Sequence, residues 1–235
     1  MSSEKEILYI DAGIIDYQEA WDLQKKILEL RYQNKIPDVL LLLEHPNTYT
    51  LGKVADKKNL LSDPDFLKEN NISVYEIDRG GDITFHGPGQ IVGYPIINLV
   101  NWKRDAHEYL RGIEEVIIRT CDEFGLKSKR NPKYTGVWID DRKIAAIGIK
   151  ISRWITMHGF AFNINTDLSL FNGIIPCGIK EKSVTSLSKE LNVEFEIKIV
   201  KEKLLNNFKQ FFEYQKLVNV DIDNFQNENV NEVTV

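Results

Sequence analysis

Residues 79–90, RGGDITFHGPGQ, carry four glycines, one proline and one histidine, with apolar runs on both sides. A turn between two strands needs one or two glycines. Four indicate a backbone that approaches another group closely, or that adopts φ angles which other residues avoid. A loop of this kind, set between strands, is a common place for a binding site on a rigid scaffold. The segment therefore predicts a sheet with a site built at this loop.

The spacing within this segment excludes two common phosphate-binding motifs. No Gly-Lys-Ser/Thr sequence closes it, and its glycines do not match the dinucleotide-binding fingerprint. From the residues alone, Arg79 holds either a carboxylate or a buried hydrogen-bond network. His86 either orients a substrate or satisfies backbone carbonyls. The segment is thus an elaborate turn or one part of a site.

The hydrophobic pattern predicts an α+β fold with helices packed on a mixed sheet. Helices open at Asp16 and Asp105, with Glu19 and Glu108 three residues on, and the second ends at Gly125. Two more helices are expected near residues 184–191 and 197–214. Strands are expected at residues 7–10, 39–43, 48–51, 73–77, 82–85, 91–99, 136–139, 143–151 and 154–164. Several are joined as hairpins, which argues against a doubly wound parallel sheet.

Composition narrows the class of protein. Apolar residues make up 43% and charged residues 28% of the 235, as in ordinary globular proteins. We expect residues 1–218 to form a single domain and residues 219–235, rich in Asn and Asp, to form a poorly ordered tail. No apolar run reaches the roughly 20 residues of a membrane span, and the first residues do not form a secretory signal. The net charge of −5 argues against a nucleic-acid partner.

Four further residues are candidates for chemistry. The two cysteines are too few for a disulfide framework, which suggests a reducing cytoplasm. Cys121 lies on a helical apolar stripe and fits a buried structural role, whereas Cys177, between Pro and Gly, fits a reactive thiol on a bend. Lys143 alone is more simply a solvated lysine at a hairpin end. His158, within an apolar strand, is by default a core histidine with a satisfied ring.

Together these pieces resemble the octanoyltransferases of lipoate biosynthesis. The motifs are RGGDITFHGPGQIVGYPI, PKYTGVWIDDRKIAAIGIKISRWITMHGFAFNINTDL and IIPCGI, and the likeness covers about residues 7–214. It implies the biotin/lipoate protein ligase-like fold, with residues 1–218 as one catalytic domain. It also implies Cys177 as acyl-thioester nucleophile and Lys143 as the residue that promotes its thiolate form and acts as acid and base. The implied acyl-binding residues are Arg79, Gly80, Gly81, Asp82, Ile83, Thr84, Phe85, His86, Ala146, Ile147, Gly148, Gly159, Phe160 and Ala161.

The resemblance also implies a reaction and its partners. The donor is octanoyl-acyl carrier protein. The acceptor is a lysine on lipoyl domains of 2-oxoacid dehydrogenase E2 subunits or of glycine cleavage H protein. A carrier thioester is already activated, so no ATP, cofactor or metal is expected. Lys127, Lys129, Arg130 and Lys133, or Lys180 with Lys182, either meet the acidic carrier or form solvated surface.

Two alternatives stay open from the sequence. An ATP-dependent lipoate ligase on the same fold would need no cysteine nucleophile. A non-catalytic module that binds carrier or lipoyl domains would need neither Cys177 nor Lys143.

Overall fold

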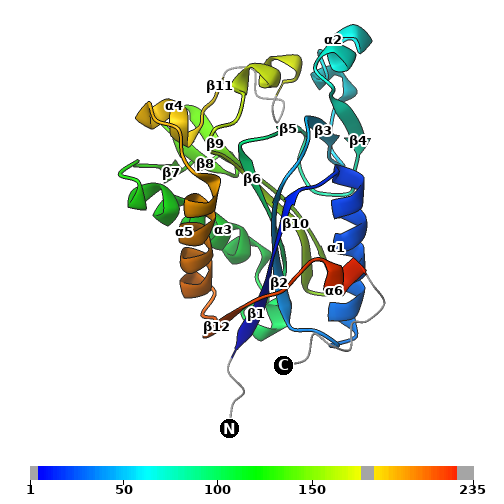
Figure 1. Cartoon of the computed structure of the whole chain (residues 1–235), viewed down its shortest axis with the longest axis vertical. Coiled ribbons are helices and arrows are strands. Elements are labelled where there is room, and N and C mark those ends of the chain that lie inside the picture. The colour runs from blue at the N-terminus through cyan, green and yellow to red at the C-terminus, as the bar shows by residue number, and fades with distance from the viewer. Residues whose placement is uncertain (1–4, 176–182, 227–235) are drawn as a thin grey trace.

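The computed structural model describes residues 5–175 and 183–226, and in that part of the chain a nine-stranded mixed sheet has helices on both faces (Figure 1). The main path runs β12-β1-β2-β6-β10-β9-β8-β7, and β11 pairs with β9. Its strands are β1 (Glu6–Ile14), β2 (Asp38–Glu44), β6 (Gln90–Ile96), β7 (Lys129–Arg130), β8 (Val137–Ile139), β9 (Arg142–Ser152), β10 (Ile155–Asn163), β11 (Ser183–Val184) and β12 (Lys216–Asn219). The predicted α+β fold with a mixed sheet is confirmed.

A second sheet of three strands lies beside the first, in the order β4-β3-β5. It consists of β3 (Thr48–Leu51), β4 (Ser73–Glu76) and β5 (Ile83–His86). A separate apolar cluster joins this sheet to the 3-10 helix η3 (Leu168–Gly173). Residues Ile83–His86 of the glycine-rich segment form β5 of the small sheet, and Gln90 begins β6 of the main sheet, so the segment joins the two sheets.

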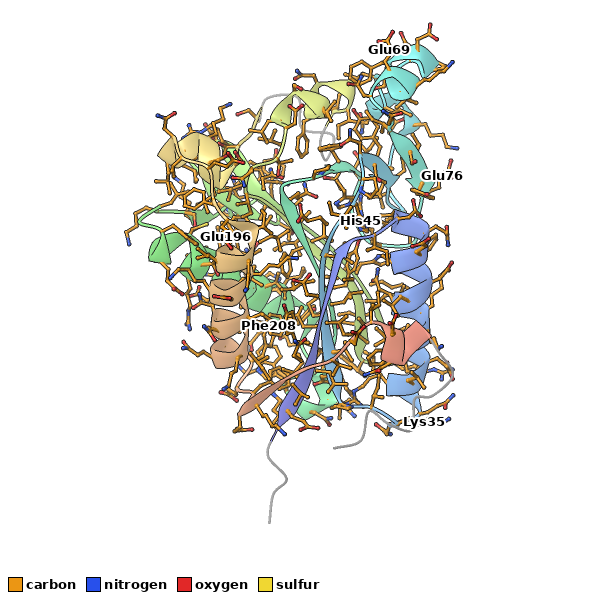
Figure 2. All side chains as sticks on the ribbon, viewed as in Figure 1. Lys35, His45, Glu69, Glu76, Glu196 and Phe208 are labelled. Atoms are coloured by element: carbon orange, nitrogen blue, oxygen red, sulfur yellow. The ribbon has the colours of Figure 1, made fainter. Side chains whose placement is uncertain are left out.

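The two faces of the main sheet bury different apolar clusters (Figure 2). Helices α3 (Ala106–Glu123) and α5 (Ile197–Phe211) cover one face, where Phe208 of α5 is fully buried. Helices α1 (Tyr17–Tyr32) and α6 (Asp223–Gln226) cover the other. The carboxylates of Asp16 and Asp105 accept backbone N–H groups of the first turns of α1 and α3, as the sequence predicts for N-caps.

The chain departs from prediction at helix α2 and at its C-terminal end. Helix α4 (Leu187–Leu191) lies within the helix expected near residues 184–191, whereas α2 (Pro64–Glu69) was not expected and has no fully buried residue that a hydrophobic pattern would reveal. After α5, β12 adds a parallel edge strand beside β1. The predicted tail begins at Asn219, but α6 follows it and fully buries Phe225 against the α1 face. Residues 227–235 lie outside the described part.

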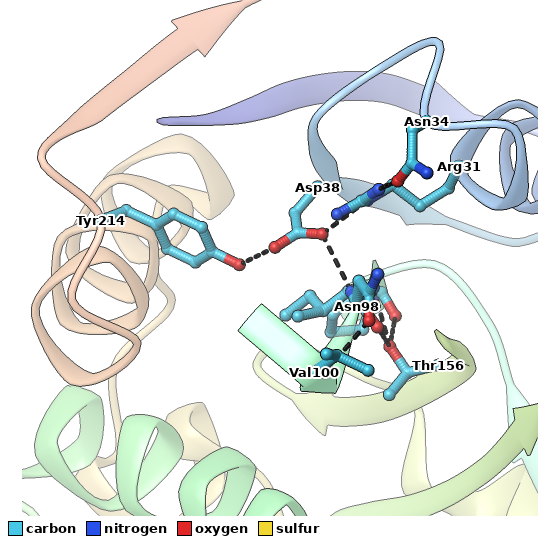
Figure 3. A network of polar contacts seen from close by, with 9 residues as sticks. Arg31, Asn34, Asp38, Asn98, Val100, Thr156 and Tyr214 are labelled. Atoms are coloured by element: carbon cyan, nitrogen blue, oxygen red, sulfur yellow. Dashed lines mark hydrogen bonds and ion pairs between the residues drawn. The ribbon is translucent and has the colours of Figure 1, made fainter. Parts of the chain in front are cut away.

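One buried polar network ties three layers together (Figure 3). Asp38 at the start of β2 accepts hydrogen bonds from Arg31 Nε at 2.8 Å, from the backbone N–H of Asn98 at 2.9 Å and from the Tyr214 hydroxyl at 2.7 Å. Arg31 Nη1 also donates to Asn34. Every oxygen of the Asp38 carboxylate is therefore used, and we call this the Asp38 network.

Candidate active site

A largely apolar pocket lies where the glycine-rich segment meets β9 and β10. It has about 470 Å³ of empty space, which includes the solvent at its open mouth. All the residues expected to bind the acyl group line it, except Gly80 and Phe85. Three segments that are distant in sequence thus converge on one pocket, although their predicted role in binding stays a prediction.

Gly80 and Phe85 face other surroundings. Gly80 lines an adjoining pocket. Side chains alternate along a strand, so Phe85 points to the opposite side of β5 from Thr84 and His86. Its ring contacts Phe171, with ring centroids 5.2 Å apart, and packs in the core of the small sheet. The expectation that Phe85 lines the acyl pocket is therefore wrong.

Arg79 fastens the glycine-rich segment to the small sheet. Its Nη2 donates to the carbonyl and to the hydroxyl of Thr50 at 2.8 and 2.9 Å, and its Nη1 donates to the carbonyl of Gly80 at 3.0 Å. The buried hydrogen-bond network, one of the two interpretations left open, is present. Arg79 also lines the pocket, so the same network fixes one wall.

The ring of His86 is fully occupied by its neighbours. Gln90 donates through its amide nitrogen to Phe85 and Asn163, so its oxygen is the atom that accepts from His86 Nδ1–H at 2.9 Å. His86 Nε2 lies 3.3 Å from the hydroxyl of Thr50 and accepts from it. Burial lowers the pKa of His86 well below its usual value, which agrees with a neutral ring. These contacts suit a positioning residue rather than a general base.

Two strand glycines permit the neighbouring backbone to approach closely. A Cβ on Gly159 would lie 2.1 Å from the carbonyl oxygen of Gly93, on the neighbouring strand β6. A Cβ on Gly148 would lie 2.9 Å from the carbonyl oxygen of Gly80. Backbone therefore fills the space that a side chain would take, and the glycines draw the pocket walls together.

Lys143 lies in the adjoining pocket, which shares Gly81, Asp82, Ile147 and Gly148 with the first. It is buried rather than solvated, with only 8% of its surface exposed. Its Nζ lies 4.8 Å from the centre of the Trp138 ring, which is a cation–π distance. The simpler interpretation of Lys143, as a solvated hairpin lysine, is therefore wrong.

The Lys143 side chain passes close to the backbone of Gly136. A Cβ at Gly136 would lie 3.3 Å from Lys143 Cε and 2.6 Å from the carbonyl oxygen of Ala145. The N–H of Gly136 donates to the buried Glu114 of α3 at 3.0 Å. Helix α3 thus holds the turn against which the lysine packs.

Cys177 lies outside the described residues, but both flanks of its segment are placed. Before it, Ile175 N–H donates to the carbonyl of Asn59 at 2.8 Å. After it, Val184 of β11 pairs with Lys143 of β9. The segment that contains Cys177 therefore ends directly beside the predicted partner lysine.

Cys121 shows what the other thiol does. It is fully buried on α3, and burial raises the pKa of its thiol to about 12. The predicted structural role of Cys121 agrees with this position.

Sequence reasoning missed two pocket residues, Tyr17 and Tyr94, and gave a third, His158, only the role of a core histidine. Tyr17 follows the helix cap on an apolar stripe, and Tyr94 lies in an apolar strand, so both look like core residues. His158 was expected to have both ring nitrogens hydrogen-bonded, but only one of them has a partner in the part of the chain that the structure describes. Its Nε2 lies 2.8 Å from Asp78 Oδ1, but its Nδ1 is buried without a hydrogen-bond partner among the described residues.

Cation sites and membrane-spanning helices were also sought in the described part. There, no group of three or more His, Cys, Asp or Glu side chains is placed to hold a metal ion. None of the helices in residues 5–175 and 183–226 is long and apolar enough to cross a membrane.

Comparison with known proteins defines the class of this chain. Residues 16–209 match the family described as the lipoyl protein ligase A/B catalytic domain. The solved bi-partite lipoate protein ligase of Thermoplasma acidophilum has a TM-score of 0.72 at 14% identity and covers 99% of this chain and 97% of its own. A biotin protein ligase of Aquifex aeolicus reaches a TM-score of 0.53 at 13% identity, over 89% of this chain and 71% of its own. These structures confirm the biotin/lipoate ligase-like fold.

The sequence relatives are more specific. The octanoyltransferase of Christiangramia forsetii is 50% identical over 226 residues, which is 89% of this chain and 97% of that protein. The chain therefore belongs to the lipoyl protein ligase A/B catalytic domain family and, within it, to the octanoyltransferases. It is an acyltransferase.

Proposed function

We propose that this enzyme transfers an octanoyl group from octanoyl-acyl carrier protein to a lysine of lipoyl domains, through a thioester on Cys177. The observation that carries the proposal is the adjacency of two pockets. The apolar pocket formed by the glycine-rich segment, β9 and β10 shares four lining residues with a second pocket, which is lined by the buried Lys143. An acyl chain in the first places its carbonyl toward the second.

The proposed reaction consists of two acyl exchanges. The Cys177 thiolate attacks the carrier thioester carbonyl, and the carrier thiolate leaves and takes a proton. The acceptor lysine, as a free amine, then attacks the enzyme thioester, loses a proton and forms an amide. Cys177 leaves as thiolate, and the amide is the more stable product.

Lys143 supports both steps in this proposal. As an ammonium it stabilises the Cys177 thiolate, and as an amine it accepts a proton from the attacking lysine. Lys143 is buried, and its Nζ lies 4.8 Å from the centre of the Trp138 ring, so packing fixes the position of the amine.

The proposed donor surface changes once the ion pairs are known. Lys127 and Lys129 lie near Asp122 and Asp140, and Arg130 pairs with Glu114 and Glu115. Lys180 and Lys182 lie outside the described residues. Three cations of the predicted cluster are thus already neutralised, which weakens it as a docking surface.

Residues 53–61 form a better docking candidate for the acidic carrier. Lys53 and Lys58 are exposed and form no ion pair with a described carboxylate. Val54 lines the Lys143 pocket and is 72% exposed, and Leu61 is 57% exposed. The segment also contacts Ile175 just before Cys177.

Docking has its own test. Changing Lys53 and Lys58 together to Glu is expected to raise KM for octanoyl-acyl carrier protein about tenfold, since rim charges mainly steer association. Turnover of the small donor octanoyl-pantetheine should not change, and Lys127→Glu serves as the paired-lysine control. Equal effects on both donors would place the carrier elsewhere.

Proposed acceptors are lipoyl domains of 2-oxoacid dehydrogenase E2 subunits and of glycine cleavage H protein. The proposed compartment is the cytoplasm, whose reducing conditions keep a thiol nucleophile free. A solved relative of the same fold was studied together with its E2 lipoyl domain, which supports this class of acceptor.

The covalent intermediate gives the main test. Incubation with octanoyl-acyl carrier protein should add one octanoyl group to the peptide that contains Cys177, as seen by mass spectrometry. Cys177→Ser should abolish the labile thioester adduct, and Cys121→Ala should keep it. ATP-dependent attachment of free octanoate that survives Cys177→Ser would instead indicate a ligase.

The role of Lys143 is tested separately. Lys143→Ala is expected to slow transfer by at least 100-fold, within the usual range for loss of an acid–base group. Lys198→Ala, on the exposed side of α5, is the control and should be silent. A Lys143→Ala variant with full activity would refute the assignment.

A further inference from the structure

The two adjoining pockets carry chemically different groups, with Lys143 lining one and His158 the other, and strand register separates the two residues. Lys143 and Ile149 lie on β9 six positions apart, or about 20 Å at 3.3 Å per residue. Ile149 pairs with His158 across the β9–β10 ladder. If the acyl carbonyl lies near Lys143, as the proposed function requires, the last carbons of the chain point toward His158.

The His158 ring has a defined tautomer. Burial lowers the pKa of His158 to about 4, so the ring is neutral at pH 7. Burial would raise the pKa of Asp78, but hydrogen bonds from Lys150 and His158 outweigh it and hold that pKa at about 2. A carboxylate only accepts, so His158 Nε2 carries the hydrogen at this 2.8 Å contact. Nδ1 is therefore a bare acceptor.

The neighbouring hydroxyls do not satisfy this acceptor. His45 Nδ1 lies 2.8 Å from the carbonyl of Ile15 and must donate to it, so His45 Nε2 accepts from the Tyr94 hydroxyl at 2.8 Å. The hydroxyl hydrogen of Tyr94 is therefore committed to His45. Tyr17 and Thr84 also line the pocket, but among the described residues His158 Nδ1 has no hydrogen-bond partner.

His158 is also rigidly held. Its backbone N–H donates to Gln24 Oε1 at 2.9 Å, and its φ is 59°, in the left-handed region. Only 1% of its surface is exposed. Trp21 Nε1 and Gln24 Nε2, on the helix packed against it, are two more buried polar atoms without a partner among the described residues. Of these three residues only His158 lines the pocket, so Nδ1 is the unpartnered atom that belongs to this end of it among the described residues.

We propose that His158 Nδ1 is a binding point for a hydrogen-bond donor on the substrate chain. The enzyme then accepts medium-chain acyl thioesters with a hydroxyl on one of their last two carbons, besides the plain octanoyl chain. The hydroxyl donates to Nδ1, and the bond-making steps at Cys177 are unchanged. An apolar pocket without such a partner rejects a buried hydroxyl by roughly 10- to 100-fold.

The first experiment compares three donors on the wild-type enzyme. Octanoyl-, 7-hydroxyoctanoyl- and 7-oxooctanoyl-pantetheine have nearly the same shape, but the second can donate a hydrogen bond and the third can only accept. The hydroxy donor should acylate the enzyme within about threefold of octanoyl, and the oxo donor should be at least tenfold slower. Rejection of both 7- and 8-hydroxy donors by tenfold or more would overturn the proposal and leave water as the partner of Nδ1.

The second experiment exchanges the tautomer. In Asp78→Asn, the Lys150 ammonium should keep the amide oxygen, so the amide nitrogen faces His158 Nε2 and donates to it. The ring hydrogen must then move to Nδ1, which becomes a donor. The ratio of oxo to octanoyl acylation should rise at least tenfold in this variant, and an unchanged ratio would refute the assigned geometry.

The third experiment removes the imidazole itself. His158→Asn tolerates the left-handed backbone but cannot place an acceptor at the same point, so the hydroxy-to-octanoyl ratio should fall about tenfold. Ratios within each variant cancel any general loss of activity. If the octanoyl donor did not acylate the wild-type enzyme, the proposed function would be wrong. If the octanoyl donor acylated it but the hydroxy donors did not, only this inference would be wrong.

Discussion

Two buried ionic networks meet strand β10 only two residues apart, and they differ in completeness. The Asp38 network, beside Thr156, uses every carboxylate oxygen and joins β2, α1 and the segment after α5. In the neighbouring Asp78–His158 pair, His158 Nδ1 has no hydrogen-bond partner among the described residues, and Asp78 is one-third exposed. The complete network suits a structural role, while the incomplete one borders the pocket. The two networks thus differ in one respect: the Asp38 network uses all its acceptors, whereas the pair beside the pocket keeps one acceptor that a ligand could use.

Among these changes, Asp38→Asn should cause the largest loss in the free energy of unfolding, because it disrupts the Asp38 network. It leaves the Arg31 guanidinium, which is 94% buried, without its counter-charge. We expect a loss of about 3–5 kcal/mol in the free energy of unfolding, measured by urea denaturation. The ratio of hydroxy to octanoyl acylation should not change.

The matched control for that change is Asp22→Asn. Asp22 pairs with Lys25 on the exposed face of α1. The free energy of unfolding should fall by no more than about 0.5 kcal/mol in Asp22→Asn. A loss below about 1 kcal/mol for Asp38→Asn would show that the two networks do not differ in stability.

The incomplete network should instead respond to acid. The pKa of His158 is lowered from 6.5 to about 4 in the folded protein, chiefly by burial. The folded state binds this proton less readily than the unfolded chain. The stability that results is full above pH 6.5 and falls as the pH drops toward 4, by about 1.4 kcal/mol per pH unit.

Urea denaturation at several pH values between 7 and 4.5 measures this slope. His45 and His86 are buried in the same region and add slopes of the same sign. His158→Asn should therefore lower the dependence of the free energy of unfolding on pH by the contribution of one proton, and the contributions of His45 and His86 should remain. An unchanged slope would mean that His158 is not neutral in the folded state.

Lys150→Met should have the smallest effect of the changes made within the two networks. Lys150 and Asp78 are each about one-third exposed, so water replaces much of their attraction. We expect a loss below about 1 kcal/mol. A loss above 2 kcal/mol would make this pair a structural joint like the Asp38 network and remove the contrast.

The local sequence pattern predicted where helices form better than it predicted which strands pair and where the C-terminal residues lie. Capping residues and apolar stripes located α1 and α3, because helix termini and amphipathic faces are local features. The pairing of β12 with β1 joins residues about 210 positions apart, and a four-residue half-exposed strand gives no signal of its partner. Phe225 was placed in a tail because a single aromatic residue among Asn and Asp has no periodicity.

The site shows a similar division. The motif segments converge on a pocket, but Phe85 was assigned to it although strand alternation around His86 opposes that assignment. Tyr17 and Tyr94 look like core residues in sequence, and only the tertiary fold turns them to the pocket. The unpaired nitrogen of His158 depends on Asp78, which lies 80 residues away in the chain, so no local pattern contains it.

The left-handed backbone at position 158 also limits how this enzyme can evolve. At a φ of 59° the residues that fit with little strain are Gly, Asn, Asp and His. Few substitutions there are open to natural variation, and most would discard the imidazole. Positions 78 and 150 have ordinary backbone and partial access to solvent. A lineage that gains or loses tolerance for a polar chain end would therefore change residue 78 or 150 before the histidine.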